Sequence, residues 1–526
     1  MTTFDWTRRG LFAAALGTAI ATSFAAPATA QTPPGVLVVG QIAEPKSLDP
    51  AAVTAVNDFR ILVNLYEGLL RYKPGTLEVG PALAESWEVS EDGTTYTFKL
   101  REGVTFHDGT PFNAEAVKFN FDRMLNEDHP YHDTGPFPLA FYFSAIEETN
   151  VVDDLTVEIK LNAPYAPFLS NLAYPTGLMV SPEAVMAGGA DFGRSPVGTG
   201  PFKFAEWRSN EAVVIEKNPD YWGDPAEADA VVFRPITDAN TRVAEMLAGG
   251  IDLMVEVPPT ALSEFQNDAF TVVEQAGPHL WFLILNAKDG PFADKLVRQA
   301  ANYAINKEAI VNDVLEGTAE VAAGPTPPAF AWAYDESLEP YPYDPEKAKA
   351  LLAEAGLAEG TELTFYVTEG GSGMLDPVPM GTAIQADLNA VGFDVKIETY
   401  EWNTFLGEVN PGLEGKADMA EMAWMTNDPD TLPYLALRTA AWPSEGGFNS
   451  GYYSNPEVDE LLEAAQTSND LEERAALYKQ MQQIVHDDAP WVFVANWKQN
   501  AVTSDKVEGL ALEPSFLLYL EDVVKN

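Results

Sequence analysis

The sequence contains no cysteine in its 526 residues. Disulfides are therefore excluded, and stability must come from the burial of apolar side chains, which a chain of this length can supply. The same absence excludes a lipid-modified cysteine. An exported form of this chain is therefore expected to diffuse freely and not to be a lipoprotein.

Histidine is also scarce, with five residues in the whole chain. His129 and His132 lie three residues apart, but Pro130 between them disfavours the shared helical face that this spacing needs for a metal site. His107 and Asp108 precede a glycine, and Asp-Gly is ordinary turn chemistry. We therefore expect no metal site from these residues.

The usual catalytic and nucleotide-binding motifs are missing. We find no P-loop, no G-x-G-x-x-G after a strand, no H-E-x-x-H and no G-x-S-x-G elbow. Residues 370–374 come near the last motif without its spacing, and they are better interpreted as a turn whose backbone N–H groups could face a ligand. We expect no catalytic residue and no cofactor, and a hydrolase is kept only as a distant alternative.

Basic residues are few, with 31 Lys and Arg against 79 Asp and Glu, which gives a net charge of −48 at pH 7. So acidic a surface repels nucleic acid and anionic lipid, and both are excluded as partners. Hydrophobic residues at 46% with charged residues at 21% are typical of a globular protein. The length predicts two or three packed units.

Long hydrophobic runs are missing except near the N-terminus. Residues 11–26 are apolar, but glycine, threonine and serine interrupt them, and the run is shorter than the roughly 18 residues of a membrane span. Arg8 and Arg9 precede the run, and residues 28–30 give the small-x-small pattern of a cleavage site. Residues 1–30 are thus predicted to be a signal peptide cleaved after Ala30. The arginine pair resembles a twin-arginine signal, with the general secretory route as the alternative.

The patterns along the rest of the chain predict an α/β fold. Residues 35–40 form a short apolar run typical of a buried strand. Alternating apolar residues on both sides of residues 91–93 predict a hairpin with its turn at Asp-Gly. Two predicted helices end at Gly356 and Gly392, and an extended run follows each of them, which is the helix-then-strand order of an α/β lobe.

Six segments, in one order along the chain, closely resemble the dipeptide/oligopeptide/nickel class (family 5) of bacterial extracellular solute-binding proteins. They are residues 83–123, 197–207, 217–223, 285–310, 343–356 and 383–402. The resemblance implies a two-lobed periplasmic-binding-protein-like fold of type II, in which discontinuous lobes are joined by a hinge. It places lobe I at residues 31–72, 195–285 and 500–526, an extra subdomain at 73–194, and lobe II at 286–499.

The resemblance also implies a function. Members of this class capture a peptide or similar solute between the lobes in the periplasm and deliver it to the permease and ATPase subunits of an ABC importer. The expected protein is a monomer without enzymatic activity. Ligand binding would shift the equilibrium between open and closed forms.

The family lines its cleft with the loop after the first strand and with segments of the second lobe. The matching residues of this chain are Glu44, Met374, Trp402, Trp424, Thr426, Asn427 and Asp428. The two tryptophans offer flat apolar walls with one hydrogen-bond donor each, although a core role is equally open to either.

Two positions depart from the peptide-binding pattern of the family. Peptide binders fix the ligand's ammonium group with an aspartate after the tryptophan, and here Asn427 occupies that place with Asp428 one residue on. Residues 370–381 also lack the arginine that would hold a carboxylate. These departures disfavour a free dipeptide and leave longer or modified peptides, opines and glutathione-like compounds open. A metal chelate of the nickel type is the runner-up ligand, and a membrane receptor is an alternative partner.

Overall fold

The structure is a computed structural model, and it describes residues 33–371 and 373–526. The predicted signal peptide lies outside the described residues. Among the residues that are described, no helix has both the length and the apolar character to cross a membrane.

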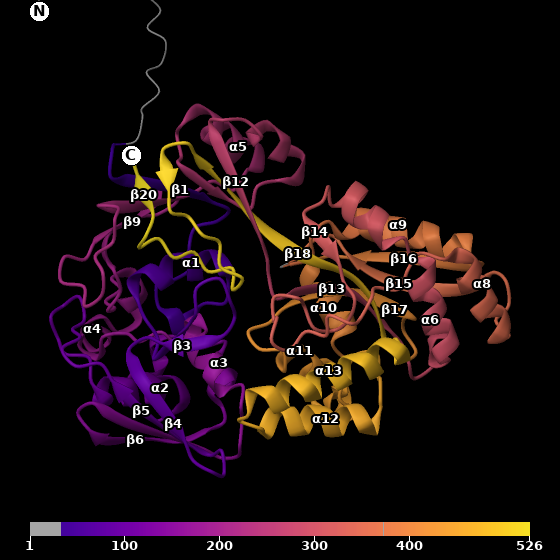
Figure 1. The fold of residues 1–526 in the computed structure, drawn as a ribbon, viewed down its shortest axis with the longest axis horizontal. Helices are drawn as coiled ribbons and strands as arrows, with labels where there is room; N and C mark the ends of the chain where they lie inside the picture. Colours follow the sequence, from indigo (N-terminus) through magenta and orange to yellow (C-terminus); the bar gives the residue numbers. More distant parts are fainter. Residues whose placement is uncertain (1–32, 372) are drawn as a thin grey trace, which may run out of the picture.

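The described chain forms two bodies that share one 12-stranded sheet (Figure 1). In the first body, β1 pairs in parallel with β10 and β11, and β10 continues through β9 to β8 in antiparallel pairs. The strands of the first body are β1 (Val36–Gln41), β8 (Phe202–Arg208), β9 (Ala212–Lys217), β10 (Ala230–Pro235), β11 (Leu253–Val255) and β12 (Phe270–Ala276). The predicted first strand is thus confirmed in β1.

In the second body, β15 lies between β16 and β17 and pairs in parallel with both, while β13 pairs antiparallel with β17. The strands are β13 (His279–Leu285), β14 (Ala319–Val321), β15 (Thr361–Thr368), β16 (Phe393–Tyr400) and β17 (Met419–Met425). The helices are α6 (Lys295–Ala304), α7 (Lys307–Ala309), α8 (Pro345–Glu354), α9 (Pro377–Ala390), α10 (Trp402–Val409), α11 (Thr431–Ala436), α12 (Pro456–Thr467) and α13 (Leu471–Asp488).

Two backbone crossings join the bodies. The long strand β18 (Trp491–Ser504) pairs with β13 and β14 up to Trp497 and with β12 from Lys498 onward. The other crossing is the link between β12 and β13, at Gly277 and Pro278. We call these two crossings the hinge.

The strand pairing suggests a different position for the expected lobe boundary. Because β13 pairs only with second-body strands, we propose that the second body begins after the link at Gly277, and not after residue 285 as the sequence suggested. In the same proposal, the boundary in β18 lies between Trp497 and Lys498, two residues before the expected position, because the pairing partner of β18 changes there.

The extra subdomain has its own four-stranded antiparallel sheet in the order β4-β5-β7-β6. Its elements are β4 (Ala84–Val89), β5 (Thr95–Leu100), α2 (Ala114–Leu125), β6 (Ile146–Asp153), β7 (Thr156–Leu161), α3 (Phe168–Ala173) and α4 (Pro182–Gly188). The predicted hairpin is confirmed as β4 and β5, and Gly93 in its turn has a φ of +69°. Tyr96 and Phe98 are fully buried, so they fill the core of this sheet.

The remaining elements belong to the first body or lie between it and the extra subdomain. They are α1 (Val56–Leu65), α5 (Ala239–Ala248) and the short strands β2 (Leu70–Tyr72), β3 (Val79–Pro81), β19 (Val507–Glu508) and β20 (Val524–Lys525). The C-terminal segment returns to α1, where the Asn64 side chain donates to the Leu518 carbonyl and accepts from the Leu520 N–H.

Side-chain caps fix the starts of α8 and α12. The Asp344 carboxylate accepts a hydrogen bond from the Lys347 N–H at 2.9 Å, and Asn455 caps α12 through the Glu457 N–H at 3.0 Å. Gly356, just after α8, has a φ of +69°, as expected of a helix terminator.

Candidate functional site

The carboxyl ends of parallel strands meet along one edge in each body. In the second body, the segments that follow β15, β16 and β17 carry Met374, Trp402 and Thr426. In the first body, Glu44 follows β1 and Glu256 follows β11. Ligands of open α/β sheets bind beyond the carboxyl ends of strands. These two edges, and the space between the bodies, therefore form the candidate site.

Both predicted tryptophans are half-buried at this edge of the second body. Trp402 begins α10 and stacks on Phe405 with ring centres 5.9 Å apart. Trp424 is in β17, and its ring lies edge-on to that of Phe448 at 5.5 Å. Each indole keeps part of its surface open, which suits a wall that a ligand could contact.

Glu44 and Met374 have protein partners already. The Glu44 carboxylate is half-buried and accepts a hydrogen bond of 2.7 Å from the Trp207 indole N–H. The Met374 side chain is fully buried in the core of the second body, and its carbonyl accepts from the Trp281 indole N–H at 3.0 Å. Met374 therefore anchors its loop in the core, and its side chain offers no surface to a ligand.

The loop after β17 joins the second body to the extra subdomain. Thr426, Asn427 and Asp428 are all buried. The Asn427 side-chain amide donates to the Asn171 side-chain oxygen at 2.7 Å, so this contact reaches from the loop to α3. The bodies thus meet at a second place, apart from the hinge; in Figure 1, α3 lies next to α12 and α13 at the end of the molecule away from β12.

The Asp428 carboxylate is used fully by protein donors. Arg474 donates to one oxygen and the Ser170 hydroxyl to the other, both at 2.8 Å, and the Asp430 N–H adds a third bond. A carboxylate held in this way is not free for a ligand's ammonium group. We therefore propose that Asp428 holds the two bodies together, in place of the ligand contact that the family pattern implied.

A cavity next to the hinge lies between the two bodies, with about 900 Å³ of empty space including its open mouth. The first body contributes Glu256 and Val257, the second contributes Glu316 and Leu375, and Trp497 of β18 also lines the cavity. Glu256, Glu316 and Leu375 have φ angles of 54°, 49° and 59°, which non-glycine residues rarely adopt. Such strained positions concentrate at ligand sites and moving segments.

A second cavity of about 840 Å³ lies between the extra subdomain and the second body. Its walls carry four aromatic side chains, and we call it the aromatic cavity. The lining residues are Phe141, Tyr142, Ser144, Ala145, Asn162, Tyr165, Asp430, Thr431, Tyr434, Leu435 and Gln466. Asn427 reaches its rim, because the Thr431 hydroxyl donates to the Asn427 side-chain oxygen at 3.1 Å.

Sequence reasoning missed this cavity and α3. The run of aromatic residues at 141–143 was the available signal, but nothing in the sequence placed it opposite Tyr434.

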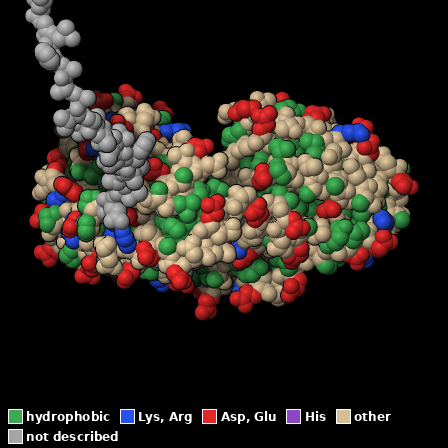
Figure 2. All heavy atoms as spheres, turned by 90° about the horizontal axis from the view of Figure 1, so that it is seen from above, with side chains coloured by type: hydrophobic (Ala, Val, Ile, Leu, Met, Phe, Trp, Pro, Cys, Tyr) green, Lys and Arg blue, Asp and Glu red, His purple; other side chains and the backbone are tan. Residues whose placement is uncertain are grey.

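The space-filling view shows the surface hollowed between the two bodies, with acidic side chains far more numerous than basic ones on the face drawn (Figure 2).

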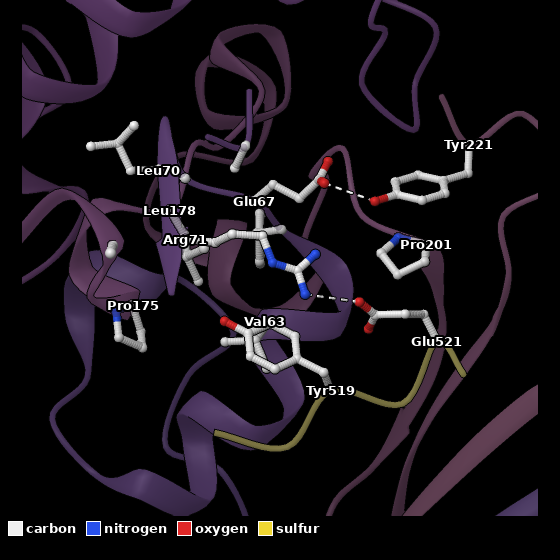
Figure 3. A pocket seen from close by; sticks show the side chains of 14 residues that line it. Val63, Glu67, Leu70, Arg71, Pro175, Leu178, Pro201, Tyr221, Tyr519 and Glu521 are labelled. Carbon is white, nitrogen blue, oxygen red and sulfur yellow. Dashed lines mark hydrogen bonds and ion pairs between the residues drawn. The ribbon is translucent and has the colours of Figure 1, made fainter. Parts of the chain in front are cut away.

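A further pocket lies inside the first body and its subdomain, under the C-terminal segment (Figure 3). The buried Glu67 carboxylate accepts from Tyr221, Trp222 and Thr199 at 2.7–2.9 Å, and burial raises the pKa of Glu67 to about 7. Arg71 pairs with Glu521 at 3.1 Å. Since this pocket has no wall from the second body, closure of the two bodies cannot enclose a ligand there.

Two of the histidines and the carboxylate of Asp108 lie in well-defined protein surroundings. Burial lowers the pKa of both His107 and His279 to about 4, so both are neutral at pH 7. The Asp108 carboxylate accepts from Thr110 and Ser181 and completes a turn. Across residues 33–371 and 373–526, no group of three or more His, Cys, Asp or Glu side chains is arranged to hold a metal ion.

Comparison with known proteins places this geometry in a family. A family model described as "Bacterial extracellular solute-binding proteins, family 5 Middle" matches residues 78–444. The chain is 35% identical over 510 residues to di/tripeptide-binding protein 2 of Pseudomonas aeruginosa, covering 94% of this chain and 95% of that protein. It is 36% identical over 473 residues to heme-binding protein A of Haemophilus influenzae, covering 86% and 85%.

A solved structure has the same architecture. HbpA2 of Haemophilus parasuis superposes with a TM-score of 0.86 at 32% identity, over 93% of this chain and all of that one. The predicted two-lobed binding-protein fold is confirmed by this match. The chain belongs to family 5 of the bacterial extracellular solute-binding proteins.

Proposed function

We propose that the protein captures a peptide or peptide-like solute between its two bodies and delivers it to an ABC importer. One observation carries the proposal: a chain related to a di/tripeptide-binding protein over nearly its whole length forms two bodies that share a hinge. In this proposal the protein acts as a monomer, performs no catalysis, and meets permease and ATPase subunits at the membrane.

The site chemistry supports a peptide-like ligand. Half-buried indole rings at the carboxyl edge of β17 and β16 offer apolar contact together with N–H donors, which is how a site can accept varied side chains. The first-body edge adds carboxylates at Glu44 and Glu256, and Arg60 already pairs with the second of these at 2.6 Å. A ligand that bridges the edges would stabilise a closed form by its differential affinity for it.

The test begins with protein purified from its own periplasm without denaturation. Native mass spectrometry should detect a retained small molecule, and calorimetry with di- to pentapeptides should then give saturable binding with a change in tryptophan fluorescence. No binding of any peptide, with a different compound retained, would contradict the peptide proposal.

Treatment with EDTA distinguishes a metal chelate, which is the runner-up ligand, from a peptide. A metal chelate should be lost, together with the fluorescence response, whereas a peptide should stay bound. Opines, glutathione-like compounds and heme are distinguished by the mass of the retained molecule. Turnover of the retained compound by the pure protein would contradict the binding function itself.

Export is part of the proposal. We propose that residues 1–30 direct the chain to the periplasm and are removed after Ala30, because an arginine pair, an apolar run and a small-x-small site follow one another. The N-terminus of periplasmic protein should then be Gln31. Loss of export in a strain without the twin-arginine machinery would assign the route.

A further inference from the structure

The aromatic cavity has aromatic walls from both bodies. The extra subdomain contributes Phe141 and Tyr142, whose ring centres lie 4.5 Å apart, and Tyr165 beside them. The second body contributes Tyr434 from α11. A group that enters the cavity can therefore contact aromatic surface on two sides.

The walls are held in place by contacts outside the cavity. The Arg438 guanidinium lies 3.3 Å from the centre of the Tyr434 ring and fixes its orientation. The Asn171 side chain donates to the Tyr142 carbonyl at 2.8 Å and anchors the opposite wall. Preorganised walls of this kind lose little conformational entropy when a ligand binds.

One wall exposes an apolar side chain that the fold leaves uncovered. Phe141 is 55% exposed although it lies between two bodies of the protein. Covering such a ring removes apolar area from water, which is favourable by roughly 25 cal/mol per Å². An apolar ligand group gains this contribution at no cost in protein hydrogen bonds.

Packing contacts link the walls of the cavity to neighbouring aromatic residues of both bodies. In the second body, Trp424 contacts Phe448, and the Phe448 N–H donates to the carbonyl of Leu435, which lines the cavity. On the other side, edge-to-face contacts of 5.5 Å run from Phe59 of α1 through Tyr174 to Tyr142. The cavity walls are thus packed against a predicted cleft residue, Trp424, on one side and against the core of the first body, at Phe59, on the other.

We propose that the aromatic cavity binds an aromatic side chain of the captured peptide, so that the protein prefers peptides with Phe, Tyr or Trp. This inference rests on the proposed function. An aromatic ring gains edge-to-face or offset-stacked contacts with the wall rings beyond its burial, whereas an aliphatic side chain of similar size gains burial alone.

Matched tripeptides test the preference on the full mature protein. Phe-Ala-Ala, Ala-Phe-Ala and Ala-Ala-Phe are titrated by calorimetry beside the same three peptides with Leu or Lys in place of Phe. At one position, Phe should bind roughly 2- to 12-fold tighter than Leu, the equivalent of one aromatic contact. The Lys series shows whether the cavity takes a cation instead, which would overturn the proposal.

Variants connect the preference to this cavity. Tyr434→Leu and Phe141→Leu keep apolar volume at half-buried or exposed sites, so both proteins should fold. Each should lower the ratio of Phe to Leu affinity, and the double variant should bring it close to one. Tyr343→Leu, at an exposed tyrosine outside the cavity, is the matched control and should leave the ratio unchanged.

The possible results of these titrations distinguish the proposed aromatic preference from peptide capture itself. Equal binding of Phe and Leu peptides, or a preference that survives the double variant, would overturn the inference while leaving peptide capture intact. If none of the nine peptides binds, peptide capture is contradicted, and the inference is overturned with it.

Discussion

At the scale of single residues, the ion pair between Asp428 and Arg474 lies within the second body, where that body contacts the extra subdomain. Both side chains are almost fully buried, with 1% and 7% of their surface exposed. An ion pair in such surroundings has lost its hydration, so removing one partner leaves the other charged and uncompensated. The Ser170 hydroxyl extends the pair across to α3.

Asp428→Asn should therefore lower the free energy of unfolding by about 3–5 kcal/mol, because Arg474 stays buried without its counter-charge. Ser170→Ala should cost less, about 1.5–3 kcal/mol, as it removes one hydrogen bond to a charged group. Urea unfolding measures both, and Ser209→Ala at an exposed position is the control. An unchanged midpoint for Asp428→Asn would contradict the structural role.

The predicted tryptophan walls can be tested with a closely matched control. Trp402→Ala and Trp424→Ala should each weaken ligand binding by about 1–3 kcal/mol, the size of a lost aromatic contact. Trp442 is half-buried and lies edge-on to Tyr452 at 5.5 Å, just as Trp424 lies against Phe448. Calorimetry should show that Trp442→Ala keeps its affinity. Unchanged affinity in both folded test variants would remove the two walls from the site.

At the scale of elements, local signals in the sequence predicted helices and hairpins well. Asp344 and Asn455 begin α8 and α12 because a cap needs only residues that are close in sequence. The assignment of β13 to a body is different. All seven of its residues are buried, so its pattern shows a central strand without indicating which sheet surrounds it.

The surroundings of the candidate site residues could be predicted less well than the fold, for the same physical reason. The resemblance located Trp402 and Trp424 near a carboxyl edge of the sheet, where both are half-buried. It could not show that Asp428 is satisfied by Ser170, 258 residues away, or that Met374 is sealed in the core. Both arrangements depend on packing between residues far apart in the sequence, which a local sequence pattern does not indicate.

Gly277, in the link between β12 and β13, allows a prediction about the hinge. A Cβ atom built there would lie 1.7 Å from the Phe516 ring, so Gly277→Ala must displace that ring from its contact with Trp497 of β18. We expect the variant to have a lower melting temperature and a smaller ligand-induced decrease in the radius of gyration by small-angle scattering.

Gly407→Ala is the control for Gly277→Ala, since its Cβ would meet nothing within 4 Å and it lies in α10. A helical glycine replaced by alanine should stabilise slightly, by about 0.5–1 kcal/mol. If Gly277→Ala and Gly407→Ala close on ligand to the same extent, the packing of Phe516 does not control the hinge.

At the scale of the whole molecule, an acidic protein has buried several of its carboxyl groups. The net charge is −48, yet burial raises the pKa of Asp58 to about 6, of Glu67 and Asp430 to about 7, and of Glu421 to about 8. A raised pKa means that the folded state holds its proton more tightly than the unfolded state does. Stability therefore falls as the pH rises from the unfolded pKa, near 4.5 for Glu, to the folded pKa. Above and below that pH window, these groups add no further pH dependence to the free energy of unfolding.

Glu421 has a strongly raised pKa and a single hydrogen-bond donor, and it allows the clearest test. Its side chain is fully buried in β17, with the Thr368 N–H as hydrogen-bond donor to one oxygen at 2.7 Å. Glu421→Gln keeps the shape and stays neutral, so it should match the native protein near pH 4, below the unfolded pKa, and be the more stable of the two at pH 8. The native protein should lose up to about 1.4 kcal/mol more per pH unit between these values. Urea unfolding at constant ionic strength measures this difference, with Glu362→Gln at an exposed position as the control. Parallel pH profiles for the native protein and Glu421→Gln would mean that Glu421 ionises in the folded state as readily as in water, and that burial is not what sets its charge.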